Sequence, residues 1–221
     1  RYFPKVLADR GVTLTRGSGA YGVPISEHVL AMMLAFTRGL TQYIRQQDRR
    51  AWERTAPISE ISGKTLGVYG MGDIGGDLAR KANALGMRVY GIARRERVAP
   101  DYVEGLWTPD RLDDMLAASD FVAACAPLTE GTRGQFAARE FGLMKDTAYF
   151  FNIGRGAVAV QADLEHALAD GQIAGAGLDV TDPEPLPQDS LLWDMENVIL
   201  TPHVSGGLDG TPQRVTDIAV E

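Results

Sequence analysis

The 221-residue chain is 45% apolar and 23% charged, which is typical of one large globular domain, or of one domain with part of a second, and not of a disordered or fibrous protein. Its net charge of −7 argues against a nucleic-acid-binding surface, its longest apolar run (residues 29–36) is too short to cross a membrane, and its one cysteine permits no internal disulfide and no cysteine-cluster metal site. Because no export signal opens the chain, we expect a cytoplasmic protein without a metal, nucleic-acid or membrane partner.

The first quarter of the chain is predicted to hold a short apolar segment, 12–14, and one long helix. Ser26 has the side chain of a helix N-cap. The residues after it repeat apolar side chains at steps of three and four, the period of one helical face: Val29, Met32, Met33, Phe36, Leu40, Tyr43 and Ile44. The polar end of this helix (45–50) and Trp52 form an arm that leaves room for a subunit contact.

From residue 64 onwards, short apolar runs alternate with helical patterns. Six runs are predicted as strands: 65–69, 89–92, 121–124, 148–151, 176–178 and 198–200. Helices are predicted between several of them, including one that ends at Gly86. Apolar runs without alternation are typical of parallel strands covered on both faces. The fold class is therefore α/β, with a Rossmann-type doubly wound parallel sheet.

The first of these strands is followed by a glycine turn of the form G-x-G-x-x-G, residues 70–75, which opens the next helix. Gly70 permits the tight turn, Gly72 lets a pyrophosphate approach the backbone, and Gly75 allows the helix to pack on the strand. The free N–H groups of the helix N-terminus then bind the anion. The alternative is a glycine-rich turn without a ligand.

The end of the second predicted strand indicates which dinucleotide binds. An acidic residue that accepts the ribose hydroxyls is expected there in an NAD site, but the chain has Arg94 and Arg95. Two guanidiniums suit the 2′-phosphate of NADP through charge-assisted hydrogen bonds. We expect NADP as the preferred cofactor; NAD stays open, since these arginines could belong to a basic loop that does not contact the cofactor.

Polar residues follow the last three predicted strands. Arg155 lies just after the fourth strand, Asp179 ends the fifth, Glu184 lies on the loop after it, and His203 follows the sixth. Ligands of an open α/β sheet bind outside the carboxyl ends of its strands, so these side chains can converge beside one cofactor. Each alone has a plainer interpretation: a strand-end histidine bonded to backbone, a solvated glutamate, a surface arginine.

Taken in order, these pieces resemble the D-isomer-specific 2-hydroxyacid dehydrogenase family over nearly the whole chain. The segments that carry the resemblance are 23–28 (VPISEH), the glycine turn, 126–132 (APLTEGT), 152–156 (NIGRG), 178–185 (LDVTDPEP) and 201–203 (TPH). The resemblance implies hydride transfer between NAD(P)H and a small 2-keto or 2-hydroxy acid, with activities such as glyoxylate or hydroxypyruvate reduction. It also implies a homodimer through the helix that starts at Ser26.

The family's catalytic residues fall on Arg155, Glu184 and His203. An imidazolium can protonate the developing alkoxide, a carboxylate beside it orients the ring, and a guanidinium can bind the substrate carboxylate and polarise the carbonyl. Asp179 is expected near the nicotinamide, holding its carboxamide or assisting Arg155. The resemblance and the motifs together give these cofactor-binding residues: Gly70, Gly72, Asp73, Ile74, Gly75, Arg94, Arg95, Ala126, Pro127, Thr132, Ile153, Gly154, Arg155, Asp179, His203, Ser205 and Gly206.

The family has a discontinuous second domain, of which we expect only remnants here. Residues 1–25 are expected to be the remnant of an N-terminal substrate domain, 26–205 the NAD(P)-binding domain, and 206–221 the start of the return to the substrate domain. We therefore expect the 221 residues to bind cofactor but to turn over poorly.

Other readings of the same fold stay open. Glu184 disfavours a formate dehydrogenase, in which a glutamine takes this place, whereas a phosphite dehydrogenase is compatible with these residues. A catalytically silent NAD(P)H-sensing protein is the alternative of another class, although it has no need of an acid–base pair. His28 is expected to be a structural residue at a helix start, His166 an exposed helix residue and Cys125 a small apolar packing residue.

Overall fold

The computed structural model describes residues 19–207 and 216–217. Seven parallel strands form one sheet in the order β3-β2-β1-β4-β5-β6-β7. The strands are β1 (Thr65–Tyr69), β2 (Arg88–Ile92), β3 (Gly105–Trp107), β4 (Phe121–Ala124), β5 (Tyr149–Asn152), β6 (Gly175–Leu178) and β7 (Val198–Leu200). The predicted segment at 12–14 lies outside the described residues.

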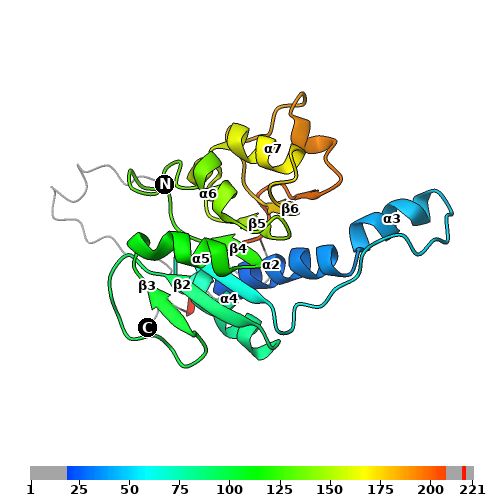
Figure 1. The fold of residues 1–221 in the computed structure, drawn as a ribbon. Coiled ribbons are helices and arrows are strands. Elements are labelled where there is room, and N and C mark those ends of the chain that lie inside the picture. Colours follow the sequence, from blue (N-terminus) through cyan, green and yellow to red (C-terminus); the bar gives the residue numbers. More distant parts are fainter. Residues whose placement is uncertain (1–18, 208–215, 218–221) are drawn as a thin grey trace.

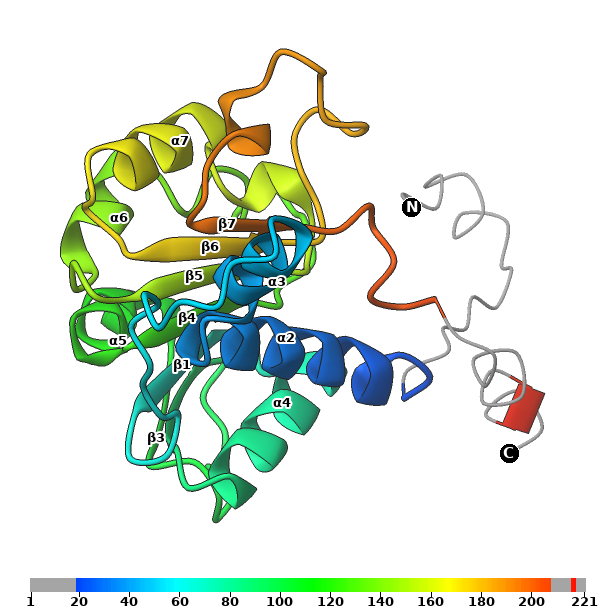
Figure 2. The ribbon, with the colours of Figure 1, turned by 90° about the vertical axis from the view of Figure 1, so that its right-hand side faces the viewer.

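Helices cover both faces of the sheet, as a doubly wound fold requires (Figures 1 and 2). They are α2 (Gly22–Thr37), α3 (Leu40–Asp48), α4 (Asp73–Ala84), α5 (Leu112–Ala118), α6 (Ala138–Leu143) and α7 (Gln161–Ala169), with 3-10 turns at 109–111, 156–158 and 191–193. Helices α2 and α4 lie on one face, and α5, α6 and α7 lie on the other. The predicted α/β class and parallel sheet are confirmed. Within the described part of the chain, no helix combines the length and apolar character needed to span a membrane.

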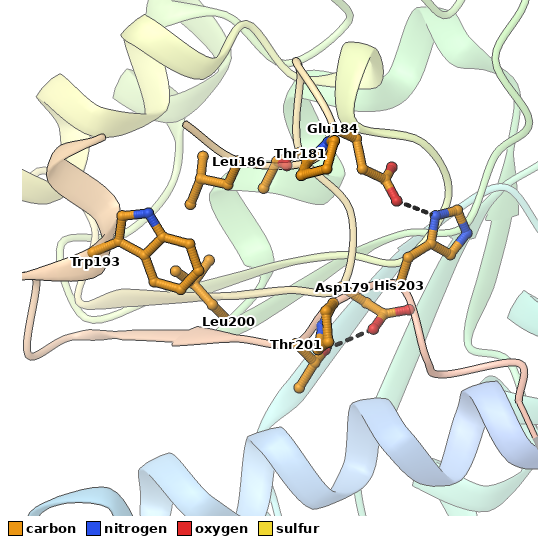
Figure 3. Close-up of a pocket in the computed structure, with 10 residues that line it drawn as sticks. Asp179, Thr181, Glu184, Leu186, Trp193, Leu200, Thr201 and His203 are labelled. Carbon is orange, nitrogen blue, oxygen red and sulfur yellow. Dashed lines mark hydrogen bonds and ion pairs between the residues drawn. The ribbon is translucent and has the colours of Figure 1, made fainter. Parts of the chain in front are cut away.

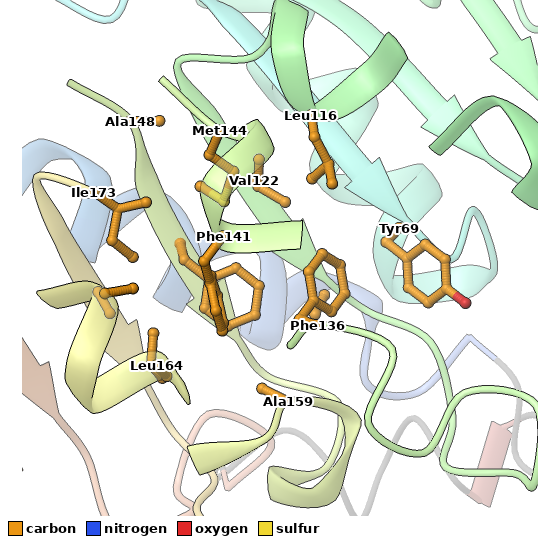
Figure 4. Packing of buried hydrophobic residues seen from close by; sticks show 14 of the residues in the cluster. Tyr69, Leu116, Val122, Phe136, Phe141, Met144, Ala148, Ala159, Leu164 and Ile173 are labelled. Carbon is orange, nitrogen blue, oxygen red and sulfur yellow. The ribbon is translucent and has the colours of Figure 1, made fainter. Parts of the chain in front are cut away.

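Each face of the sheet has its own apolar core. On the side of α5–α7, the rings of Phe136 and Phe141 pack against Phe150, with centroid distances of 4.9 and 5.3 Å (Figure 4). All three side chains are fully buried. Truncating one such ring costs about 3–5 kcal/mol. This packing holds β5 against α6 and against the segment that follows β4.

The helix expected to start at Ser26 starts earlier. Helix α2 begins at Gly22, after Tyr21, and Ser26 is a buried residue of the helix interior. The Ser26 hydroxyl donates to the Asp77 carboxylate of α4 at 2.7 Å, and the carbonyl oxygen of Val23 lies 2.8 Å from the same hydroxyl. The serine therefore fastens α2 to α4 and caps nothing, so the N-cap prediction is wrong.

The same helix is also two helices and not one. Gly39 has a φ of 62° and separates α2 from α3, and a Cβ at this position would lie 2.4 Å from the Ala56 side chain. Helix α3 and the irregular segment after it project away from the sheet as an arm (Figure 1). Apolar spacing continues across Gly39, which is why the pattern predicted a single helix.

Candidate active site

The candidate residues lie along one edge of the sheet, because all seven strands are parallel and all of these residues follow a strand end. Strand order reverses between β1 and β4, and such a switch point opens the crevice in which a doubly wound sheet binds its ligand. The glycine turn follows β1, and Ala126 and Pro127 come after β4. The fold thus puts the predicted phosphate cradle at the switch point.

The three glycines of the turn each have the geometry that their predicted role requires. Gly70 has a φ of 103°, and a Cβ there would lie 2.6 Å from the backbone nitrogen of Ala126. A Cβ at Gly75 would lie 2.2 Å from the carbonyl oxygen of Gly70, so α4 packs directly on the turn. At Gly72 nothing lies within 4 Å of where a Cβ would stand. The turn is closed on its inner side and open on its outer side, which fits a pyrophosphate at the N-terminus of α4.

The other cofactor residues of this region shape the loops around the turn. The Asp73 carboxylate accepts the N–H of Gly19 at 2.8 Å. The Thr132 hydroxyl donates to the carbonyl of Pro127 at 2.7 Å and so closes the loop after β4. A Cβ at Gly154 would lie 2.6 Å from the carbonyl oxygen of Ala126, which brings the end of β5 against that loop.

The arginine loop after β2 contains one residue that the sequence did not single out. Arg94 and Arg95 are exposed and make no hydrogen bond or ion pair within the described residues. Arg97, in contrast, donates through Nη2 to the carbonyl oxygen of Met71, inside the glycine turn. The sequence feature that could have indicated Arg97 is the repetition of arginine at 94, 95 and 97. The contact ties the arginine loop to the phosphate cradle and leaves the other two guanidiniums free to meet a ligand.

Glu184 and His203 come together as predicted (Figure 3). The Glu184 Oε1 lies 2.5 Å from the His203 Nδ1, and both side chains are about 40% exposed. They border a cavity of about 350 Å³ whose wall is mostly apolar. The lining residues are Asp179, Thr181, Glu184, Pro185, Leu186, Trp193, Leu200, Thr201, Pro202 and His203. An imidazole held by a carboxylate at the mouth of a cavity is the arrangement of a general acid or base.

Arg155 does not join this pair in the structure. Its side chain is exposed and donates through Nη1 to the carbonyl oxygen of Gly154 at 2.6 Å. No hydrogen bond or ion pair links Arg155 to Glu184 or His203 within the described residues. The backbone does bring the two loops together, because a Cβ at Gly156 would lie 1.9 Å from the carbonyl oxygen of Thr181. The catalytic role of Arg155 stays a prediction.

Asp179 is buried and holds the loop on which His203 lies. Its carboxylate accepts the Thr201 hydroxyl at 2.6 Å and the N–H groups of Val204 and Ser205 at 2.9 and 3.0 Å. Burial alone would raise the pKa of Asp179, but the hydrogen bonds from Ser205, Thr201 and Val204 hold it below its usual value. Within the described residues Asp179 makes no contact with Arg155, so its predicted help to that residue is not seen here.

The backbone of His203 has an uncommon conformation that this buried carboxylate explains. Its φ is 54°, in the left-handed region that costs a non-glycine residue about 1–3 kcal/mol unless its surroundings fix it. The His203 N–H donates to the carbonyl oxygen of Asp179 at 2.9 Å. With the two bonds from the next N–H groups, three successive amides converge on one aspartate. Ser205, a predicted cofactor residue, is buried by this arrangement, and Gly206 follows it.

His28 is the second residue whose role the sequence missed. It lies inside α2 and not at the helix start, and its Nε2 is 2.9 Å from the Thr201 hydroxyl and 3.8 Å from the Asp179 carboxylate. Cys125, at the end of β4, has a thiol whose burial raises its pKa to about 12, which fits the predicted packing role. Within the part of the chain that the structure describes, no group of three or more His, Cys, Asp or Glu side chains could hold a metal ion.

Fold and site together define a dinucleotide-binding α/β protein whose sheet edge has a hydrogen-bonded glutamate–histidine pair. A family model for the NAD-binding domain of the D-isomer specific 2-hydroxyacid dehydrogenases matches residues 30–205. The chain therefore belongs to this family. It is an oxidoreductase that uses NAD or NADP.

Relatives of known name agree with this assignment. The chain is 35% identical to a glyoxylate reductase of Korarchaeum cryptofilum, over 98% of the chain and 67% of that relative. Among solved structures, a phosphoglycerate dehydrogenase from Lactobacillus plantarum matches with a TM-score of 0.83 and 37% identity, over 99% of this chain and 71% of that one. An NADPH-dependent glyoxylate/hydroxypyruvate reductase from Sinorhizobium meliloti matches with a TM-score of 0.78 and 35% identity, over 86% of this chain and 96% of that one.

Proposed function

We propose that the protein reduces a small 2-keto acid, of the size of glyoxylate or hydroxypyruvate, to the D-2-hydroxy acid. The observation that carries this proposal is the 2.5 Å contact between Glu184 and His203 at the mouth of a cavity, on the sheet edge that also bears the glycine turn. The names of the relatives supply the substrate class, since two of the three are called glyoxylate or glyoxylate/hydroxypyruvate reductases.

In the proposed mechanism, His203 is the general acid. A reduced nicotinamide held at the glycine turn would supply the hydride. The Nε2–H of His203 gives its proton to the oxygen that becomes the hydroxyl. The Glu184 carboxylate accepts a hydrogen bond from the Nδ1–H of His203. This bond fixes the tautomer and the direction of the ring and stabilises the imidazolium. In the reverse direction, the neutral ring takes the hydroxyl proton.

Arg155 is proposed to hold the substrate carboxylate and to polarise the carbonyl that is reduced. A planar guanidinium forms two parallel hydrogen bonds with a carboxylate and so orients the substrate. The side chain is exposed, and its one side-chain hydrogen bond within the described residues is to the carbonyl oxygen of Gly154, so it has no ion pair to break when it turns toward a substrate. Asp179 takes part indirectly, by holding the loop of His203.

NADP is proposed as the preferred cofactor, because Arg94 and Arg95 lie beside the glycine turn and have no hydrogen bond or ion pair with the described part of the chain. Replacing both by alanine should raise the Kd of NADPH about 10- to 100-fold, through the loss of two charge-assisted hydrogen bonds, and leave the Kd of NADH within about twofold. Titration of each variant with both cofactors, followed by tryptophan fluorescence, measures this. Arg54→Ala, an exposed arginine on the arm, is the matched control. Equal loss for both cofactors would contradict the assignment.

The substrate class is tested by a panel of glyoxylate, hydroxypyruvate, pyruvate and phosphite, with the loss of NADPH absorbance, or its gain for phosphite, as the readout. We expect slow turnover with at least one keto acid and none with phosphite. Turnover with phosphite alone would overturn the proposal in favour of a phosphite dehydrogenase. Chiral analysis of the product decides the D configuration.

We also propose that the protein is a homodimer through α2 and the arm that contains α3. This surface has large apolar side chains that are exposed to solvent: Ile44 is 60% exposed, Ile58 is 54% exposed and Trp52 is 98% exposed. Apolar patches of this kind on a soluble protein are typical of subunit interfaces.

A further inference from the structure

His28 lies on α2, far along the chain from the proposed catalytic histidine. Two contacts on one helical face fix α2 to the carboxyl edge of the sheet. Met32 packs closely over β6, since a Cβ at Gly177 would lie 2.8 Å from its sulfur. One turn earlier, the His28 Nε2 reaches the Thr201 hydroxyl, across 173 residues of sequence. The His28 side chain is 22% exposed and the Asp179 side chain is fully buried, so the contact is shielded from water.

The direction of each hydrogen bond in this chain follows from the protons available. The lowered pKa of Asp179 means that its carboxylate is ionised near neutral pH and can only accept. Thr201 has a single hydroxyl proton, which it donates to Asp179 at 2.6 Å. The Thr201 oxygen must therefore accept from His28, whose Nε2 bears the proton. The tautomer of His28 is fixed by its partners.

This chain ends at the loop of His203. Asp179 uses the same carboxylate to accept the N–H groups of Val204 and Ser205, and its own carbonyl accepts the N–H of His203. These bonds fix the left-handed backbone of His203, and that backbone directs the ring toward Glu184. Figure 3 shows the Asp179–Thr201 bond and the Glu184–His203 pair, each of which joins the segment after β6 to the segment after β7.

We propose that His28 is a positioning residue for His203, acting through Thr201 and Asp179. The proposal rests on the proposed catalytic role of His203. It assigns to α2, a helix on one face of the sheet, a direct part in the geometry of the reaction. Removal of the Nε2–H leaves the Thr201 oxygen without its donor, loosens the bond to Asp179 and lets the His203 ring leave the line of the Glu184 carboxylate.

The direct test is nuclear magnetic resonance of the chain with 15N-labelled histidine. The chain has three histidines, so three imidazole spectra are expected. At about pH 8, where a free imidazole is neutral, we expect His28 in the Nε2–H tautomer and a downfield Nδ1 proton on His203 from its bond to Glu184. His28 in the Nδ1–H tautomer would overturn the proposal. This readout needs no turnover, so it decides the proposal even where the proposed reaction fails.

Variants connect the geometry to the rate. His28→Phe keeps a ring but has no donor, whereas His28→Gln puts an amide N–H at about the same reach. In His28→Phe we expect the downfield proton of His203 to be lost and kcat to fall about tenfold, with the KM for NADPH unchanged within about twofold. His28→Gln should restore both. Failure of His28→Gln to restore either, or a wild-type His203 proton and kcat in His28→Phe, would contradict the role.

Thr201 gives an independent pair of variants if the substitution of His28 prevents folding. Thr201→Val keeps the shape and removes the hydroxyl, whereas Thr201→Ser keeps it. We expect Thr201→Val to reproduce the kcat and NMR changes of His28→Phe, and Thr201→Ser to behave as the wild type. If Thr201→Val folds with an unchanged His203 proton, the relay through Thr201 is refuted.

Discussion

At the scale of single residues, the buried carboxylate of Asp179 has the largest structural consequence. It accepts hydrogen bonds from a side chain and two backbone amides of one loop, and each bond is stronger because the acceptor is charged. Neutralising it leaves those donors facing a weaker partner whose side chain is fully buried. The loop that presents His203 therefore depends on the ionised form of Asp179.

Asp179→Asn should lower the free energy of unfolding by about 2 kcal/mol at neutral pH, through the loss of charge-assisted hydrogen bonds. The folded protein holds the pKa of Asp179 below that of the unfolded chain, about 3.9. The stabilisation is thus complete above that value and is lost as the pH falls through the lower folded-state pKa. Urea unfolding of both proteins between about pH 7 and pH 3 should show a difference that shrinks in acid. The pKa values of Asp77 and Asp120 are also lowered, but both residues are present in the wild type and in the variant. Their contributions therefore cancel in the difference between the two unfolding free energies. A difference that grows in acid would contradict this account.

Which single residues could be foreseen depended on whether their signal was local. Glu184 and His203 stand in short motifs next to strand ends, so the topology alone brings them to one edge. His28 contacts Thr201, and Arg97 contacts Met71. Both contacts join segments that are distant in sequence, so no local pattern predicts them. The guanidinium of Arg155 was placed by motif on the correct strand end, but its direction depends on side-chain torsions that a sequence does not determine.

At the scale of elements, the turn between β1 and α4 has the sharpest steric requirement in the cofactor site. Gly75 and Gly76 are neighbours at the start of α4, yet they differ in what surrounds them. A Cβ at Gly75 would lie 2.2 Å from the carbonyl oxygen of Gly70, whereas a Cβ at Gly76 would meet nothing within 4 Å. An alanine at Gly75 therefore tests the packing of the turn, whereas an alanine at Gly76 tests helix propensity alone.

Gly75→Ala should destabilise the protein by about 1–3 kcal/mol, because the helix must move off the turn, and should weaken NADPH binding at least about tenfold. Gly76→Ala should instead stabilise it by up to about 1 kcal/mol, since alanine favours a helix over glycine. Thermal unfolding and NADPH titration of both variants measure these effects. Equal behaviour of the two variants would show that the turn does not depend on close packing at Gly75.

The sequence patterns failed for two kinds of element: those too short to show a period, and those in which one residue type has two possible roles. Strand β3 has three residues and shows no resolvable period, and it forms only because β2 offers a free edge. At the start of α2 a serine looks like a cap, but the helix begins four residues earlier and uses that serine to bind Asp77. The long buried strands were predicted well, since burial on both faces leaves a continuous apolar run.

At the scale of the whole molecule, the arm that contains α3 stands out because packing on the sheet does not account for its position. Helix α3 has little packing against the body, and Trp52 is 98% exposed. Ordering such a segment in water with so much apolar surface is unfavourable, and a second copy of the chain would bury it. The predicted dimer surface and the shape of the arm thus point to the same contact.

Trp52→Ser should raise the dissociation constant of the dimer at least about tenfold, because large aromatic side chains contribute most of the energy of an interface. Sedimentation equilibrium across a range of concentrations measures it. Val98→Ser is the control, since Val98 is 93% exposed but lies on the loop after β2. A wild-type protein that is monomeric throughout, or a Trp52→Ser protein that dimerises as well as the wild type, would contradict the proposed interface.

The central claim is that Glu184 and His203 form the acid–base pair of an NAD(P)H-dependent keto-acid reductase, and His203→Ala tests it most directly. The measurement is the rate of NADPH oxidation by a 2-keto acid, with the Kd of NADPH determined on the same samples. We predict that the variant binds NADPH as the wild type does while its rate falls about 10²- to 10⁴-fold, the range of general acid–base catalysis. A variant that retains the wild-type rate would contradict the account.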